Sequence, residues 1–140
     1  MKKSIIFVLS LLCIILCSCK KEPKDLLLGT WEVSVTMTTS SSVSAPSTHD
    51  GGVWFFSFDE RGRGRMVQSD DTSIKYDFTY KYDKGLNSIL YTLSDSNEEL
   101  EWEVIILTRD RFVFSSETSA DLLDDYSYKV VSTLKGEKIM

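Results

Sequence analysis

Residues 74–85 read Ile-Lys-Tyr-Asp-Phe-Thr-Tyr-Lys-Tyr-Asp-Lys-Gly, and this stretch decides the class of fold. Its large apolar side chains fall on every second residue from Ile74 to Tyr82, and charged or hydroxyl side chains fall between them. A period of two places each set on its own face of a β-strand, and the Asp-Lys-Gly ending is typical of a hairpin turn. The stretch therefore predicts a half-buried strand followed by an antiparallel neighbour.

The same pattern recurs on both sides of this stretch. Seven further segments are predicted as strands, most of them rich in β-branched and aromatic residues: 31–38, 53–58, 63–68, 89–93, 100–107, 112–114 and 126–134. Short turns at most junctions, without an amphipathic helix, indicate an antiparallel meander of eight strands. Closing such a meander into an up-and-down barrel removes its exposed edges, so the predicted fold is an all-β, eight-stranded barrel. The Ser/Thr-rich 39–52 and the acidic 117–125 are predicted as loops.

The amino-terminal end has the features of an export signal. Two lysines precede an apolar run over residues 5–16, which is too short to span a bilayer and has the length of a signal-peptide core. The run ends in Leu-Cys-Ser-Cys at 16–19, which resembles the lipobox of bacterial lipoproteins. This resemblance implies cleavage after Ser18 and attachment of several acyl chains to Cys19, which together anchor a protein to a membrane. A plain secretory signal and an apolar amino-terminal helix are the alternatives.

Removal of residues 1–18 defines the mature chain. Its remaining 122 residues make one domain over 26–140, preceded by the lipidated cysteine and a polar tether over 19–25. The signal carries two lysines and no acid, so the net charge moves from −5 to −7, which disfavours nucleic-acid partners. The only cysteine left is Cys19, so the core must hold without disulfides. Lys20, directly after it, favours the outer membrane of the cell envelope, by resemblance to sorted lipoproteins.

Aromatic residues on the apolar strand faces are candidates for ligand contacts. Tyrosine and tryptophan provide an apolar wall with polar atoms, which suits the binding of a small molecule. The candidate ligand-binding residues are Trp54, Phe56, Tyr76, Phe78, Tyr80, Tyr91 and Trp102. The same side chains could instead fill the barrel as a packed core, since an eight-stranded barrel is narrow. Both an open and a filled barrel remain possible from the sequence.

The first strand begins with Gly29-Thr30-Trp31, which resembles the Gly-x-Trp signature of lipocalins. The order of the later strands looks like the small lipocalin-like lipoproteins of Gram-negative bacteria, over residues 26–134. The resemblance implies an up-and-down barrel with Trp31 packed across its closed end and a basic residue stacked on that ring. Lys135 is the nearest candidate for the basic residue. The resemblance also implies binding of small hydrophobic molecules.

Catalytic and metal-binding constellations are weak. His49 is the only histidine and lies in a Ser/Thr-rich segment without a nucleophile-elbow motif, so neither a transition-metal site nor a catalytic triad is indicated. Glu101 and Glu103 fit a solvated strand face. Arg63 and Arg65 share a strand face and could receive a carboxylate or phosphate, although such residues more often keep an exposed strand soluble.

Two functions follow from these features. The first is a membrane-anchored lipocalin-like protein that binds a small hydrophobic or amphipathic ligand without catalysis, cofactor or metal. The second is a filled barrel that acts as a structural or protein-interaction module of the cell envelope, through segments 39–52 and 117–125. The second hypothesis leaves the protein partner unknown.

Overall fold

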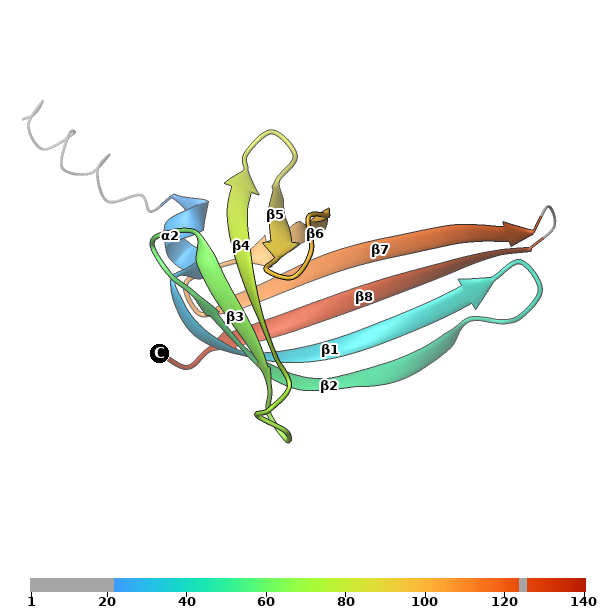
Figure 1. Cartoon of the computed structure of the whole chain (residues 1–140), viewed down its shortest axis with the longest axis horizontal. Helices are drawn as coiled ribbons and strands as arrows, with labels where there is room; N and C mark the ends of the chain where they lie inside the picture. Colours follow the sequence, from blue (N-terminus) through green and yellow to red (C-terminus); the bar gives the residue numbers. More distant parts are fainter. Residues whose placement is uncertain (1–21, 124–125) are drawn as a thin grey trace, which may run out of the picture.

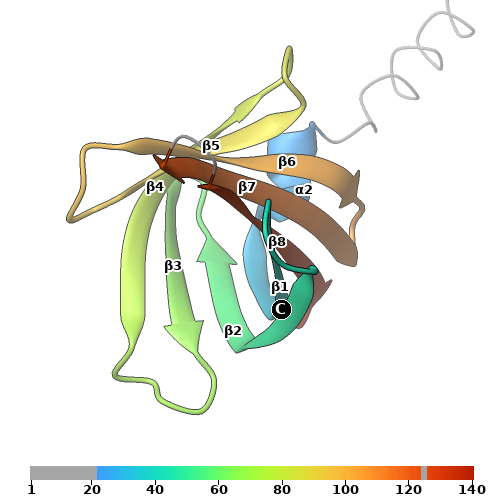
Figure 2. The same cartoon turned by 90° about the vertical axis from the view of Figure 1, so that its right-hand side faces the viewer.

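The computed structural model describes residues 22–123 and 126–140, and within them the chain forms a closed antiparallel barrel. Each strand pairs with the next one along the chain, and β8 pairs with β1 to close the barrel. The strands are β1 Gly29–Ser41, β2 Ser47–Phe58, β3 Arg63–Gln68, β4 Lys75–Asp83, β5 Ser88–Leu93, β6 Glu99–Leu107, β7 Arg111–Leu123 and β8 Tyr126–Lys138. The predicted eight-stranded meander barrel is confirmed (Figures 1 and 2).

The register of the strands brings the large apolar residues to one interior. Trp31 of β1 lies opposite Phe56 of β2, and Ile89 of β5 lies opposite Trp102 of β6. All four side chains are buried, while their neighbours along each strand mostly face outward. This is the physical consequence of the period of two, since successive strand side chains point to opposite faces.

Four of the strands are much longer than the others. β2 pairs with β3 only from Trp54 to Phe58, and β7 pairs with β6 only from Phe112 to Ser115. Beyond these pairs, β1, β2, β7 and β8 continue together past the shorter strands, as Figure 1 shows. We call this part the projecting sheet; it comprises residues 36–41, 47–52, 116–123 and 126–132.

The prediction of loops over 39–52 and 117–125 is therefore wrong for most of both segments. β1 continues to Ser41, β2 begins at Ser47, and β7 continues to Leu123. These segments lack hydrophobic alternation because neither face of the projecting sheet is packed against a core, and the strands are held by backbone pairing to their neighbours. Asp124 and Asp125 lie outside the described residues.

One end of the barrel is closed by a short helix, α2 Pro23–Leu27. The helix takes up residues 23–25, which the sequence analysis placed in the tether, and it contacts β4 and β6. Its Leu27 is fully buried and accepts a hydrogen bond of 2.7 Å from the indole Nε1 of Trp31, whose ring is also fully buried. The predicted position of Trp31 at the closed end is thus confirmed.

The basic residue on the Trp31 ring is Lys138, and the choice of Lys135 is wrong. The Lys138 ammonium lies 4.8 Å from the ring centroid and donates a hydrogen bond of 3.0 Å to the carbonyl oxygen of Leu26. Strand β8 runs four residues past the predicted end at 134, and its register sets Lys138 opposite Trp31. Lys135 lies opposite Ser34 and is exposed.

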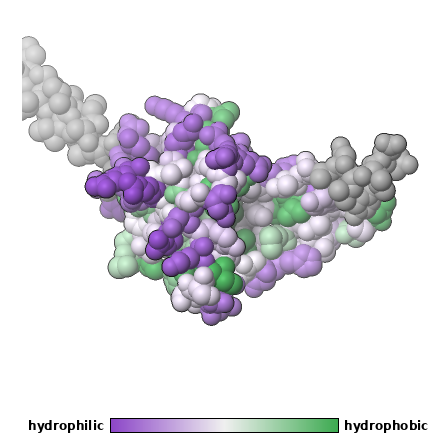
Figure 3. Space-filling model, in the orientation of Figure 1, coloured by the Kyte–Doolittle hydropathy of each residue, from purple (hydrophilic) through white to green (hydrophobic). Residues whose placement is uncertain are grey.

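The half of the barrel next to α2 is filled with aromatic rings. Phe112 lies 4.9 Å from Trp31 and stacks on Phe114 at 4.0 Å between ring centroids. Gly136 makes room for this stack, since a Cβ atom there would approach the Phe112 ring to 2.4 Å. The outer surface over this half carries mostly hydrophilic residues, whereas the projecting sheet is paler in Figure 3, with residues of intermediate hydropathy.

The predicted signal over 1–18 and the lipobox cysteine Cys19 lie outside the described residues. Within 22–123 and 126–140, no helix has the length and apolar composition needed to cross a bilayer.

Candidate functional site

The half of the barrel next to the projecting sheet is not filled. It contains a cavity of about 350 Å³ to which all eight strands contribute. The lining residues are Val35 and Met37 of β1, Gly51, Trp54 and Phe56 of β2, Met66 of β3, Tyr76 of β4, Tyr91 and Leu93 of β5, Trp102 of β6, Ser116 of β7, and Ser132 and Leu134 of β8. The barrel is thus filled at one end and hollow at the other, so each of the two sequence-based alternatives describes one half.

Aromatic rings form much of the cavity wall. Tyr91 stacks on Trp102 with ring centroids 3.8 Å apart, and Trp54 lies 6.2 Å from Tyr76. The indole Nε1 of Trp54 donates to the carbonyl oxygen of Gly51 at 3.1 Å, so this ring offers its apolar surface to the cavity. Burial raises the pKa of Tyr91, which keeps its hydroxyl protonated and uncharged. Such a wall favours apolar contents.

Besides the two tyrosine hydroxyls, two serines add polar groups to the wall. Ser116 of β7 and Ser132 of β8 lie directly opposite each other in the ladder, and both line the cavity. Among the described residues, no Asp, Glu, Lys or Arg lines the cavity. The site therefore has hydrogen-bonding groups but no formal charge.

The structure brings together most of the predicted ligand-binding residues. Five of the seven line the cavity: Trp54, Phe56, Tyr76, Tyr91 and Trp102. Their role as ligand contacts stays a prediction. Sequence reasoning missed Val35, Met37 and the two serines; for the serines, the only signal was a hydroxyl at an inward position of a strand.

Phe78 and Tyr80 do not line the cavity, although the Phe78 ring packs behind Trp102 and Tyr91. Phe78 is 1% exposed and packs in the filled half, edge-on to Phe58 at 5.7 Å. The Tyr80 hydroxyl donates a hydrogen bond of 2.7 Å to the carbonyl oxygen of Asp59, in the turn between β2 and β3. Burial, with smaller contributions from the carboxylates of Asp59 and Asp25, raises the pKa of Tyr80 to about 12. These two positions belong to the packing of the closed end.

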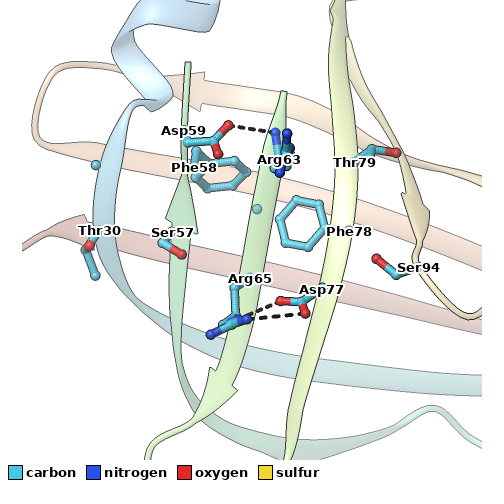
Figure 4. A pocket seen from close by; sticks show the side chains of 12 residues that line it. Thr30, Ser57, Phe58, Asp59, Arg63, Arg65, Asp77, Phe78, Thr79 and Ser94 are labelled. Carbon is cyan, nitrogen blue, oxygen red and sulfur yellow. Dashed lines mark hydrogen bonds and ion pairs between the residues drawn. The ribbon is translucent and has the colours of Figure 1, made fainter. Parts of the chain in front are cut away.

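A second depression, of about 490 Å³, lies on the outer surface over β2, β3 and β4 (Figure 4). It is larger than the cavity, but two of its charged groups, Arg65 and Asp77, are already paired with each other. The Arg65 guanidinium donates to both carboxylate oxygens of Asp77, at 2.6 and 3.3 Å, and this pairing lowers the pKa of Asp77. An arriving anion would meet the Asp77 carboxylate beside Arg65, so the anion-binding interpretation gains no support at Arg65.

The remaining polar candidates are surface residues. The His49 Nε2 atom lies 3.2 Å from the Ser47 hydroxyl, and the His49 side chain is exposed on the projecting sheet. Glu101 and Glu103 are exposed on β6, where Glu101 accepts a hydrogen bond from Ser88. In the part of the chain that the structure describes, no three His, Cys, Asp or Glu side chains are grouped to hold a metal ion.

Comparison with known proteins finds similar folds among solved structures but no match by sequence. No family model matches the sequence, and no curated protein matches it. Among solved structures, a polyisoprenoid binding domain from Saccharophagus degradans is 12% identical with a TM-score of 0.45, covering 80% of this chain and 99% of that one. Apocrustacyanin C2 (TM-score 0.44, 80% of this chain and 61% of that one) and lobster apocrustacyanin A1 (0.43, 79% and 61%) are also 12% identical. At this level of similarity they carry no information on the site.

Proposed function

We propose that this protein is a membrane-anchored binding protein that holds a small hydrophobic or amphipathic molecule in its barrel without catalysis. The observation that carries the proposal is the cavity of about 350 Å³, which lies at the low end of the size range of small-molecule sites. Its wall is aromatic and aliphatic with a few hydroxyl groups, from two serines and two tyrosines, as such sites usually are. A barrel filled throughout, the basis of the protein-interaction alternative, fits this half of the molecule less well.

The lipid anchor at Cys19 supplies the membrane attachment in this proposal. Only three residues separate Cys19 from Pro23, the first residue of α2, so the attachment point lies at most about 14 Å from the helix. Because α2 covers the closed end, this end would face the bilayer and the cavity would open away from it. The ligand would then be exchanged with the aqueous side of the envelope.

Two tyrosines on the same face of β4 provide a matched test of the cavity. The probe is N-phenyl-1-naphthylamine, an uncharged fluorescent molecule, titrated into the protein from Lys20 onward, which contains α2 and all eight strands. Tyr76→Ala removes a ring from the cavity wall and should weaken probe binding about fivefold, since an aromatic contact is worth roughly 1 kcal/mol. Tyr80→Ala removes a ring from the closed end, so it should lower the unfolding midpoint in urea and leave probe affinity unchanged.

Absence of saturable probe binding to the unaltered protein, or equal loss of affinity in both variants, would overturn the binding function.

The anchor is tested separately by Cys19→Ala in the whole chain. This change should leave the protein uncut or release it into the soluble envelope fraction. Normal processing with persistent membrane association would show that Cys19 is not the anchor.

A further inference from the structure

The cavity has no group that could neutralise an ionic ligand. Every described side chain that lines it is uncharged, and burial already raises the pKa of Tyr91, which shows that this environment disfavours charge. Moving a carboxylate or ammonium group from water into such a site without a partner is strongly unfavourable. The part of a ligand that enters the cavity is therefore uncharged.

The projecting sheet continues the cavity wall outward. Met37, Ser132 and Ser116 lie side by side on β1, β8 and β7, and all three line the cavity. Because strand side chains alternate, every second residue beyond them lies on the same face, which we call the inner face. Beyond the cavity the inner face carries Thr39, Ser41, Ser47, Thr118, Tyr128 and Val130. Five of these six side chains bear a hydroxyl group.

The charged side chains that the structure describes on the projecting sheet lie on its opposite face. Glu117 and Lys129 form an ion pair of 3.1 Å there, and Asp50 shares that face by register with Thr36. His49 is on the inner face, opposite Met37.

The hairpin loops at the open end are acidic. The segment between β3 and β4 carries Asp70 and Asp71, and that between β5 and β6 carries Asp95 and Glu98. Hydrogen bonds from Ser73 lower the pKa of Asp71, which keeps its carboxylate ionised at neutral pH. These loops would repel an anionic headgroup, while the described side chains of the inner face include no acid to hold a cationic one.

From these features we infer that the ligand is an uncharged amphipathic molecule whose apolar part occupies the cavity and whose hydroxyl-rich polar part, a sugar or polyol, lies on the inner face. This inference rests on the proposed function and specifies the ligand class of that site. Hydroxyl groups of the ligand exchange hydrogen bonds with Thr39, Thr118 and Ser132, and a hydroxyl both donates and accepts.

The test compares four amphiphiles that share a ten-carbon chain and differ in the polar end. They are decyl maltoside, decanol, decanoate and decyltrimethylammonium, each below its micelle-forming concentration at pH 8. Affinity is measured by displacement of N-phenyl-1-naphthylamine from the protein that starts at Lys20. Decyl maltoside should bind at least about fivefold more tightly than decanol, as expected for one net hydrogen bond, and at least tenfold more tightly than either ion.

Paired threonine variants locate the polar contact. Thr39→Val with Thr118→Val removes two inner-face hydroxyls with little change of shape, and should bring decyl maltoside to the affinity of decanol while decanol itself is unaffected. Thr38→Val with Thr48→Val makes the same chemical change on the outer face, where these two hydroxyls lie 3.4 Å apart, and should change neither affinity.

The outcomes separate this inference from the function beneath it. Decanoate or decyltrimethylammonium binding as tightly as decyl maltoside would overturn the uncharged ligand class. Equal affinities for decanol and decyl maltoside, or equal effects of the two variant pairs, would overturn the inner face as the polar site. In both cases the cavity would still be a binding site. Failure of the probe and of all four amphiphiles to bind would overturn the binding function itself.

Discussion

The closed end and the projecting sheet are built from the same strands, yet they differ in what holds them. At the closed end Trp31 and Phe112 are fully buried, and Lys138 and α2 lie over the tryptophan. Eight residues further along β1, Thr39 has backbone partners on both sides but no packed layer above it. Stability is concentrated at the closed end, because burial of apolar area is the main favourable term in folding. The projecting sheet is left free to contact other molecules.

Trp31→Ala should show the largest contrast between the two regions. Removal of this fully buried ring should lower the free energy of unfolding by about 3–5 kcal/mol, since it leaves a large cavity under α2 and removes the bond to Leu27. Thr39→Ala in the same strand should cost less than about 1 kcal/mol. Urea denaturation followed by circular dichroism measures both, and similar costs would contradict the division of the molecule into a stable and a lightly held region.

Two glycines extend the comparison to the backbone. Gly136→Ala would place a Cβ atom 2.4 Å from the Phe112 ring, and should cost about 1–3 kcal/mol through overpacking. Gly52, at the bulge where β2 leaves the barrel, has φ of +84° and open space around it, so Gly52→Ala meets only backbone strain of roughly 1 kcal/mol. Thermal unfolding of both variants measures which substitution costs more stability. A larger loss of stability for Gly52→Ala than for Gly136→Ala would contradict the tight packing of the closed end.

Lys138→Met tests the basic residue over Trp31. The change removes the ammonium from the ring face and from the Leu26 carbonyl, and should lower the free energy of unfolding by about 1 kcal/mol. Lys135→Met, three residues away on the exposed side of β8, should stay within about 0.5 kcal/mol of the unaltered protein. Equal effects in chemical denaturation would show that the ring contact contributes nothing specific.

The smallest expected effect is a pH dependence at the closed end. The pKa of Tyr80 is about 12 in the folded protein against about 10 in the unfolded chain, so its contribution is complete below pH 10 and declines as the pH rises toward 12. Because the side chain is half-exposed, the decline by pH 11 should be less than about 1 kcal/mol. Tyr80→Phe should flatten the free energy of unfolding between pH 9 and 11. An unchanged slope would assign the alkaline loss to other groups.

Much of the fold could be predicted because its signals are local. The alternation in residues 74–82 reports which strand face is buried, and turn residues such as Asp83-Lys84-Gly85 report where the chain reverses. The candidate site was predicted only in part. Tyr76 and Tyr80 are the same residue type on the same face of one strand, and only one lines the cavity, so periodicity identifies the face but not the height along the barrel.

The number of strands and the inward face of each core strand could be read from the sequence alone, because side-chain alternation and turn chemistry act over a few residues. The length of the projecting sheet, the choice of Lys138 over Lys135, and the boundary between the filled and hollow halves became clear only in the folded structure. These features depend on pairing between residues far apart in the chain, such as Thr39 with Val130. Strand register is a property of two partners, and neither partner's sequence contains it alone.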